Sequence, residues 1–105
     1  MIDIASVEEL EREVFQSPLP VLMDFWGPRC APCLAQMPFI EGLASSLEAK
    51  LRVIKVDATQ SRQLCIRMKV LGLPTYILVN QGREVRRLQG SRVTEKEIAD
   101  LVAEA

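Results

Sequence analysis

Apolar residues gather in two short runs that predict strands buried on both faces of a sheet. The first run, Val21–Trp26, is apolar except for Asp24. The second run covers residues 51–57. A carboxylate inside a buried strand is costly unless it is paired, so Asp24 is a candidate for a role other than packing.

A third part of the chain has the pattern of a β-hairpin. Thr75–Asn80 is rich in residues that favour strands. Asn80-Gln81-Gly82 supplies turn residues, and Glu84–Leu88 is the expected returning strand. The pattern therefore predicts two antiparallel strands that follow each other directly.

The first predicted helix spans residues 7–16. Ser6 and Glu9 have the spacing of a capping box, in which two side chains bond the free backbone N–H groups of a helix start. Apolar residues follow at helical spacing. The two prolines in Ser17–Pro20 end the helix.

Three further helices are predicted downstream. Apolar residues from Cys30 to about Lys50 follow helical spacing, and Pro38 inside this segment is expected to kink the helix. Residues 60–69 predict a short helix. Thr94 and Glu97 form a second capping box, which opens a C-terminal helix.

The order of elements predicts an α/β fold. The predicted order is helix, strand, helix, strand, helix, two strands and a final helix, and a short strand is also possible before the first helix. Alternating helices and buried strands are typical of a parallel sheet covered on both faces, and the hairpin adds antiparallel strands at one edge. We expect a central mixed sheet flanked by about four helices. A chain of 105 residues predicts a single domain over residues 1–105.

Charge and hydropathy exclude some classes of partner. The formal net charge is −1, whereas nucleic acids and anionic membranes call for a basic excess. The N-terminus lacks the basic and apolar segments of a signal peptide. No apolar stretch reaches the ~20 residues of a membrane span. These features predict a cytoplasmic protein.

The chemistry of the chain is expected at Cys30-Ala31-Pro32-Cys33, which follows a strand and opens a helix. The spacing places both sulfurs on one helix face, close enough to form a disulfide. The positive end of the helix dipole favours the Cys30 thiolate, which is the nucleophile. Cys33 lies one turn further in and is the expected resolving cysteine. Pro32 suits a first helical turn because its missing N–H would have no partner there.

The alternatives for this motif are a structural zinc site and an accidental pair of cysteines. Structural zinc generally takes four Cys or His ligands, but the chain has no histidine and one further cysteine, Cys65. No metal and no cofactor other than the Cys30–Cys33 couple are therefore expected. Cys65 itself is either a small buried hydrophobe or an exposed thiol open to modification.

The segment Asp24–Cys33 (DFWGPRCAPC) closely resembles the active site of thioredoxins. Further landmarks follow in the order of that family and at nearly its spacing: Pro38, Lys55, Asp57, Gly72-Leu73-Pro74-Thr75 and Gly90. The resemblance covers almost the whole chain. It implies a thioredoxin fold and dithiol–disulfide exchange with client proteins.

The resemblance also assigns roles around the cysteines. It implies a cis peptide bond before Pro74, which faces the two cysteines, and a substrate chain that pairs with the backbone of Leu73. A cis X–Pro bond costs only about 0.5–1 kcal/mol, so local packing can hold it. Gly90 either lets substrate approach the site or simply ends a strand. The alternative for Leu73-Pro74-Thr75 is a proline that only begins a strand.

Asp24 matches the buried aspartate that lies beneath the resolving cysteine in this family. Burial raises the pKa of a carboxyl group, so Asp24 is expected to take the proton of Cys33, with Lys55 as its charge partner. The alternative is a purely structural buried ion pair. Trp26 is expected to pack beside the site as scaffold, with a smaller part in substrate contact.

Two positions depart from the usual thioredoxin motif. Arg29 stands where the family has tryptophan, and Ala31 where it has glycine. A positive charge beside Cys30 would stabilise its thiolate and make the couple more oxidising, unless the arginine points into solvent. The predicted substrate-contacting residues are Trp26, Arg29, Ala31, Pro32, Leu73 and Gly90.

Three functions fit these residues. The first is a protein-disulfide reductase that is re-reduced by a thioredoxin-reductase-type donor. The second is an oxidant or isomerase, which the Arg29 charge favours and the expected location disfavours. The third is a binding or assembly subunit without exchange activity, which has no need for Cys30, Cys33, Asp24 and Pro74 together. We expect a monomer.

Overall fold

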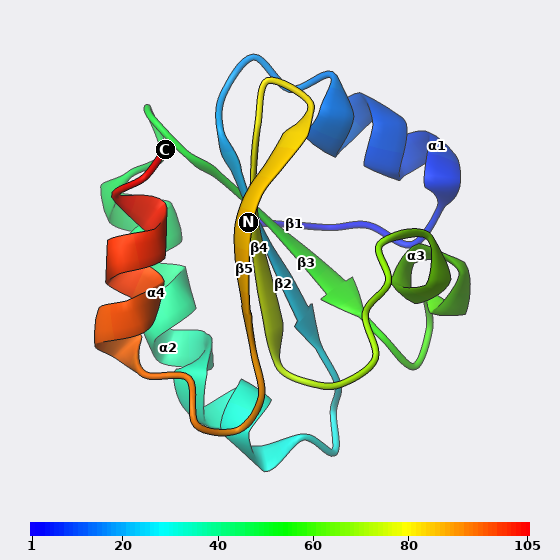
Figure 1. Ribbon diagram of the computed structural model, residues 1–105, viewed down its shortest axis with the longest axis vertical. Helices are drawn as coiled ribbons and strands as arrows, with labels where there is room; N and C mark the ends of the chain where they lie inside the picture. Colours follow the sequence, from blue (N-terminus) through cyan, green and yellow to red (C-terminus); the bar gives the residue numbers. More distant parts are fainter.

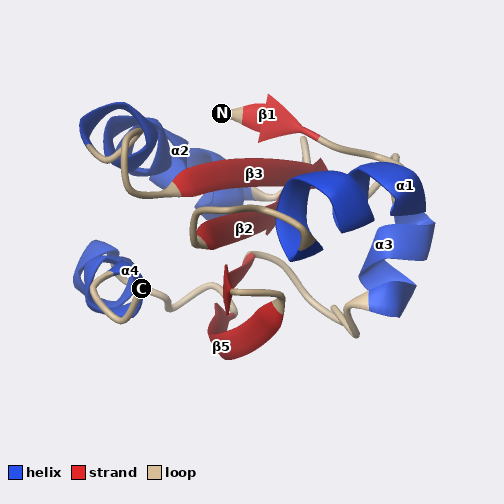
Figure 2. Ribbon diagram, turned by 90° about the horizontal axis from the view of Figure 1, so that it is seen from above, coloured by secondary structure: helices blue, strands red, loops and turns tan.

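The computed structural model describes residues 1–105 as a five-stranded sheet between two groups of helices (Figures 1 and 2). The strands are β1 (Ile2–Asp3), β2 (Val21–Trp26), β3 (Arg52–Asp57), β4 (Thr75–Asn80) and β5 (Arg83–Gln89). The helices are α1 (Val7–Leu10), the π-helical segment η1 (Glu11–Phe15), α2 (Ala31–Ser46), α3 (Arg62–Arg67) and α4 (Glu95–Val102). None of these helices is long and apolar enough to cross a membrane.

The sheet is mixed, as the sequence predicts, with the strands in the order β1-β3-β2-β4-β5. Strand β2 is central and pairs in parallel with β3, which pairs in parallel with β1. Strands β4 and β5 form the antiparallel hairpin at the other edge. Residues Val21–Phe25 of β2 are buried, as expected for a strand covered on both faces.

Two apolar clusters hold the helices onto the sheet, one on each face. The cluster below α1, η1 and α3 includes Val21, Met23 and Phe25 from β2. The cluster below α2 and α4 includes Leu22 from β2 and Ile40 from α2. Because side chains alternate along a strand, Asp24 and Trp26 share the face of Leu22, towards α2. Figure 2 shows α2 and α4 together on one side of the sheet and α1 and α3 on the other.

The helix starts are where the capping boxes predict them. Ser6 and Thr94 are the N-caps of α1 and α4, and both boxes are complete in the structure. The predicted first helix near residues 7–16 is present over Val7–Phe15, but its second half, Glu11–Phe15, is π-helical, which the sequence pattern did not indicate. The wider turn lets both Val14 and Phe15 pack on the core.

Other predicted boundaries were too wide or too narrow. Helix α2 begins after Cys30 and ends at Ser46, because the chain must then turn into β3. Helix α3 is shorter than residues 60–69, and β5 is longer than Glu84–Leu88. Pro38 lies inside α2, where its missing N–H removes one backbone hydrogen bond. The kink stays a prediction.

The hairpin loop is tighter than predicted. Asn80 belongs to β4 and pairs with Arg83, which leaves Gln81 and Gly82 as the loop. Both loop residues have positive φ, 52° for Gln81 and 76° for Gly82. A two-residue hairpin loop with a type I′ turn requires positive φ at both positions. A side chain at Gly82 would also come within 3.2 Å of the Phe15 backbone oxygen, so glycine fits there on two counts.

Candidate active site

Cys30 and Cys33 are joined by a disulfide at the start of α2, with their Cα atoms 5.2 Å apart. Cys30 is the N-cap of the helix, and Cys33 lies in its first turn. Cys30 is half-buried, whereas Cys33 is 1% exposed. An incoming sulfur can therefore reach Cys30 and not Cys33.

The helix start favours negative charge on the Cys30 sulfur. The backbone N–H of Cys33 donates a hydrogen bond to Cys30 Sγ over 3.3 Å. The first turn of α2 contains no acidic residue that would oppose a thiolate. Once the disulfide is reduced, the positive end of the helix dipole stabilises the thiolate at this position.

Asp24 is the one buried carboxyl group of the chain, and its side chain has no hydrogen-bond partner. It is 1% exposed. Loss of hydration raises its pKa to about 7, and the charge of Lys55 opposes this shift only in part. A carboxyl group with this pKa can both take up and release a proton near neutral pH.

Lys55 lies next to Asp24 in the sheet, but the two side chains form no ion pair. The strand register places the residues directly opposite each other on β3 and β2. The Lys55 ammonium lies 5.0 Å from the centre of the Trp26 ring and 3.7 Å from the Asp3 carboxylate. Trp26 is half-buried and contacts Lys55, a placement that suits a scaffold residue.

The loop before β4 is hydrogen-bonded to Gly90, the residue that follows β5. The Leu73–Pro74 peptide bond is cis, and Pro74 is buried. The Gly90 N–H donates to the Pro74 carbonyl over 2.9 Å, and Gly90 has a φ of 103°, which glycine adopts without strain. Gly90 directly follows β5, so it does end a strand.

The residues around Cys30 form an open surface. Arg29 and Ala31 are exposed, and Pro32 and Leu73 are half-buried. Arg29 forms no ion pair or side-chain hydrogen bond, which agrees with the alternative of an arginine in solvent. The Arg29 side chain is thus free to contact a client, whereas Leu73 also packs against the core cluster on the α1 side.

Two residues that support the site were given no role from the sequence. A Cβ atom on Gly27 would lie 3.2 Å from Leu73 Cδ1, so glycine lets the Leu73 side chain pack against the cysteine loop. Thr75 is buried, and its hydroxyl donates to the Gly72 carbonyl over 2.6 Å. The contact between Gly27 and Leu73 joins segments far apart in sequence, and the Thr75 hydrogen bond depends on the geometry of its loop. Neither can be predicted from the residue pattern.

The third cysteine and metal binding can be judged from the same structure. Cys65 is half-buried and packs against the core cluster on the α1 side, and burial raises the pKa of its thiol. These features fit a small hydrophobe better than a reactive thiol. No group of three or more His, Cys, Asp or Glu residues could hold a metal ion.

Comparisons with known proteins agree with this geometry. The family model Thioredoxin matches residues 2–104. Thioredoxin from Acetoanaerobium sticklandii is 36% identical over 95 residues, which are 90% of each chain. The bifunctional thioredoxin reductase/thioredoxin of Mycobacterium leprae is 34% identical over 85% of this chain and 19% of its own length. The crystal structure of Fasciola hepatica thioredoxin superposes with a TM-score of 0.90 over 99% of this chain and 98% of its own, at 25% identity.

Proposed function

The chain belongs to the thioredoxin family and is a dithiol–disulfide oxidoreductase; on that basis we propose that it works as a reductant of disulfides in client proteins. The observation that carries this proposal is the half-exposed Cys30 at the start of α2, bonded to the buried Cys33. This difference in access separates an attacking sulfur from a resolving one. The whole chain, residues 1–105, acts as one domain.

The proposed reaction has two exchange steps. The Cys30 thiolate attacks one sulfur of the client disulfide, forms a mixed disulfide and releases the other client sulfur as a thiolate. Cys33, once deprotonated, attacks Cys30 and releases the second client sulfur. The client gains two electrons and two protons, and the protein is left with the Cys30–Cys33 disulfide.

Asp24 is the proposed proton acceptor for the second step. Cys33 is buried in the first turn of α2, and Asp24 is buried on the sheet face below that helix. A pKa of about 7 suits a group that takes up the Cys33 proton and then returns it to solvent. Lys55, its sheet neighbour, limits how far that pKa rises.

Client proteins are the proposed substrates, bound across the surface around Cys30. The proposed contacts come from Trp26, Arg29, Ala31, Pro32, Leu73 and Gly90, with Pro74 facing the two cysteines as the resemblance implies. Leu34, one residue beyond Cys33, is 45% exposed and extends the apolar part of this surface. An extended client segment beside the Leu73 backbone would bring its disulfide to Cys30.

The electron donor is proposed to be a reductase of the thioredoxin-reductase type. Support comes from the Mycobacterium leprae relative, whose name combines thioredoxin reductase and thioredoxin in one protein. We further propose that the protein acts as a monomer in the cytoplasm. It uses no cofactor beyond its own dithiol.

The reduction potential of the Cys30–Cys33 couple tests the direction of electron flow. We expect a value near or below about −250 mV in glutathione or dithiothreitol buffers, as for a cytosolic reductant. Because Arg29 is exposed and unpaired, its charge is screened, and Arg29→Gln should change the potential by less than about 10 mV. A potential above about −200 mV that falls in Arg29→Gln would instead establish the oxidant alternative.

A further inference from the structure

Four side chains on neighbouring strands form one row across the sheet. The register places Asp3 opposite Lys55, Lys55 opposite Asp24, and Asp24 opposite Tyr76. Residues directly opposite each other project from the same face of a sheet. The side chain of Asp3 is 73% exposed, whereas Asp24 and Tyr76 are buried. The row thus runs from solvent at the β1 edge to the buried carboxyl group near the cysteines.

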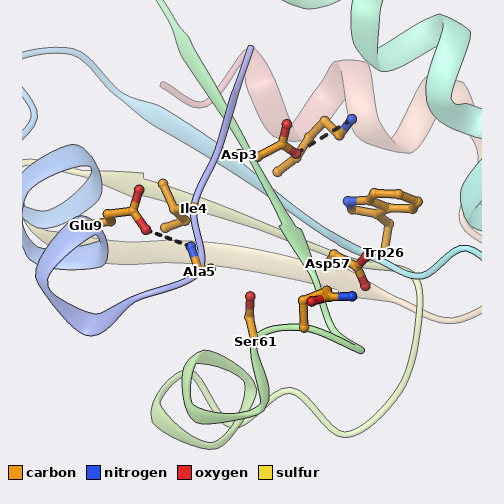
Figure 3. A pocket seen from close by; sticks show the side chains of 9 residues that line it. Asp3, Ile4, Ala5, Glu9, Trp26, Asp57 and Ser61 are labelled. Atoms are coloured by element: carbon orange, nitrogen blue, oxygen red, sulfur yellow. Dashed lines mark hydrogen bonds and ion pairs between the residues drawn. The ribbon is translucent and has the colours of Figure 1, made fainter.

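Within this row the Lys55 ammonium is held at the solvent end. Its nitrogen lies 3.7 Å from Asp3 Oδ1, and both Asp24 oxygens are without a hydrogen-bond partner. The Trp26 ring, 5.0 Å away, adds a second favourable contact at the same end. Figure 3 shows Asp3, with its ion pair dashed, and Trp26 among the residues that line one pocket at the β1 edge.

We propose that Asp3 is a positioning residue for the exchange reaction: its carboxylate holds the Lys55 ammonium at the β1 edge and so withholds it from Asp24. The inference rests on the proposed role of Asp24 for its functional meaning. The placement of the lysine itself rests on the three strand pairings and the two Lys55 contacts alone.

Asp3 and Asp24 compete for the Lys55 ammonium, and the two positions of the ammonium are close in free energy. The pair is exposed on the Asp3 side only, since the Asp3 side chain is 73% exposed and the Lys55 side chain 18%. Ion pairs that reach the surface contribute roughly 0–1 kcal/mol, so Asp3 attracts Lys55 only weakly. Asp24 has the stronger field because it is buried, but the ammonium must lose hydration to reach it. Beside the exposed Asp3 the ammonium is paired and loses less hydration than it would beside the buried Asp24, which makes the outer position the better one.

The other groups around Asp24 do not replace Lys55 in this role. Strand β3 also carries Asp57 on this face, and β4 contributes the Tyr76 hydroxyl, whose pKa is raised by burial and by the Asp24 charge. Helix α2 contributes Cys30 and Cys33 and the neutral Gln36. The residues of β5 and α4 that join the cluster on this face are apolar: Leu88, Ile98, Leu101 and Val102. Lys55 is thus the positive charge whose position sets how far the effect of burial on the Asp24 pKa is offset.

The test is the pKa of Asp24 in the oxidised protein, where Cys30 and Cys33 do not titrate. It can be followed by ¹³C NMR of the side-chain carboxyl group, with Asp24→Asn to assign the signal. In Asp3→Asn the freed ammonium can approach Asp24, so we expect the pKa to fall by about one unit. The pH dependence of mixed-disulfide resolution should shift in the same direction.

Two further variants separate this effect from general electrostatics. Asp100→Asn removes the same charge and also a Lys ion pair, on the exposed face of α4, and should leave the Asp24 pKa unchanged. In a Lys55→Met background, Asp3→Asn should shift that pKa by less than about 0.2 unit, since no ammonium is left to move.

An unchanged or raised Asp24 pKa in Asp3→Asn would overturn the inference, as would an equal fall in the Lys55→Met background. Neither result would touch the exchange activity or the role of Asp24 in it. That role fails separately, if Asp24→Asn resolves mixed disulfides at the rate of the unmodified protein.

Discussion

Replacement of Cys30 by serine is expected to abolish disulfide exchange. A serine hydroxyl stays protonated at neutral pH and forms no disulfide, so neither the attack nor the Cys30–Cys33 product can occur. Reduction of a model protein disulfide with dithiothreitol as electron source should then proceed only at the rate measured without the protein. The fold should be retained, because Cys30 is a half-buried N-cap residue and serine is a good N-cap.

The matched control is Cys65→Ala, which removes the other thiol. Cys65 packs at the edge of the core cluster on the α1 side, away from the α2 side that carries the cysteine pair. We expect full exchange activity with a small loss of stability. If Cys30→Ser kept the biological function of the protein, the chain would be an assembly subunit, and its redox chemistry would be incidental.

Replacement of Asp24 by asparagine is expected to stabilise the protein strongly at alkaline pH. The pKa of Asp24 rises from 3.8 in the unfolded chain to about 7 in the folded protein. Between these values the folded state binds the extra proton, so stability is full below pH 4, falls up to pH 7 and is constant above it. Three pKa units correspond to about 4 kcal/mol. The 1% exposure of Asp24 leaves little solvent to screen this cost.

Denaturant unfolding at several pH values measures this effect. Asp24→Asn should exceed the unmodified protein by about 4 kcal/mol in unfolding free energy at pH 8, and the difference should shrink towards pH 4. Asp100→Asn, at an exposed ion pair, should change stability by less than about 1 kcal/mol at either pH. A difference between Asp24→Asn and the unmodified protein that did not vary with pH would show that the Asp24 pKa is not raised by burial.

The same substitution is expected to slow the second exchange step. Without a carboxyl group to accept the Cys33 proton, the mixed disulfide should persist longer, by 10²-fold or more, since general bases contribute roughly 10²–10⁴-fold. The first step, in which Cys30 attacks, should keep its rate. Greater stability together with slower resolution would identify Asp24 as a group retained for catalysis at a cost in folding energy.

The parts of the fold that follow from local patterns were predicted well. The strand of Val21–Trp26 and both capping boxes depend on residues close in sequence, and the structure has them as predicted. The π-helical Glu11–Phe15 was missed, because its wider turn is set by how two side chains meet the core. The spacing of apolar residues along the chain does not predict how Val14 and Phe15 pack on the core.

The candidate site divides in the same way. The spacing of Cys30 and Cys33 is enough to predict a redox-active pair. The apolar residues on both sides of Asp24 likewise predict that it is buried. The contact of Lys55 with Asp3 was not predicted, because it depends on the register between β1 and β3. The packing of Leu73 on Gly27 likewise joins two loops that only the folded sheet brings together.

The most direct test of the central claim is to trap the mixed disulfide. Cys33→Ser can attack a client but cannot resolve the product, so incubation with an oxidised client protein should give a stable one-to-one adduct. Peptide mapping by mass spectrometry should find the client bonded to Cys30. An adduct at Cys65, or no adduct from a variant made from an active protein, would contradict the assignment of Cys30 as nucleophile and Cys33 as resolving cysteine.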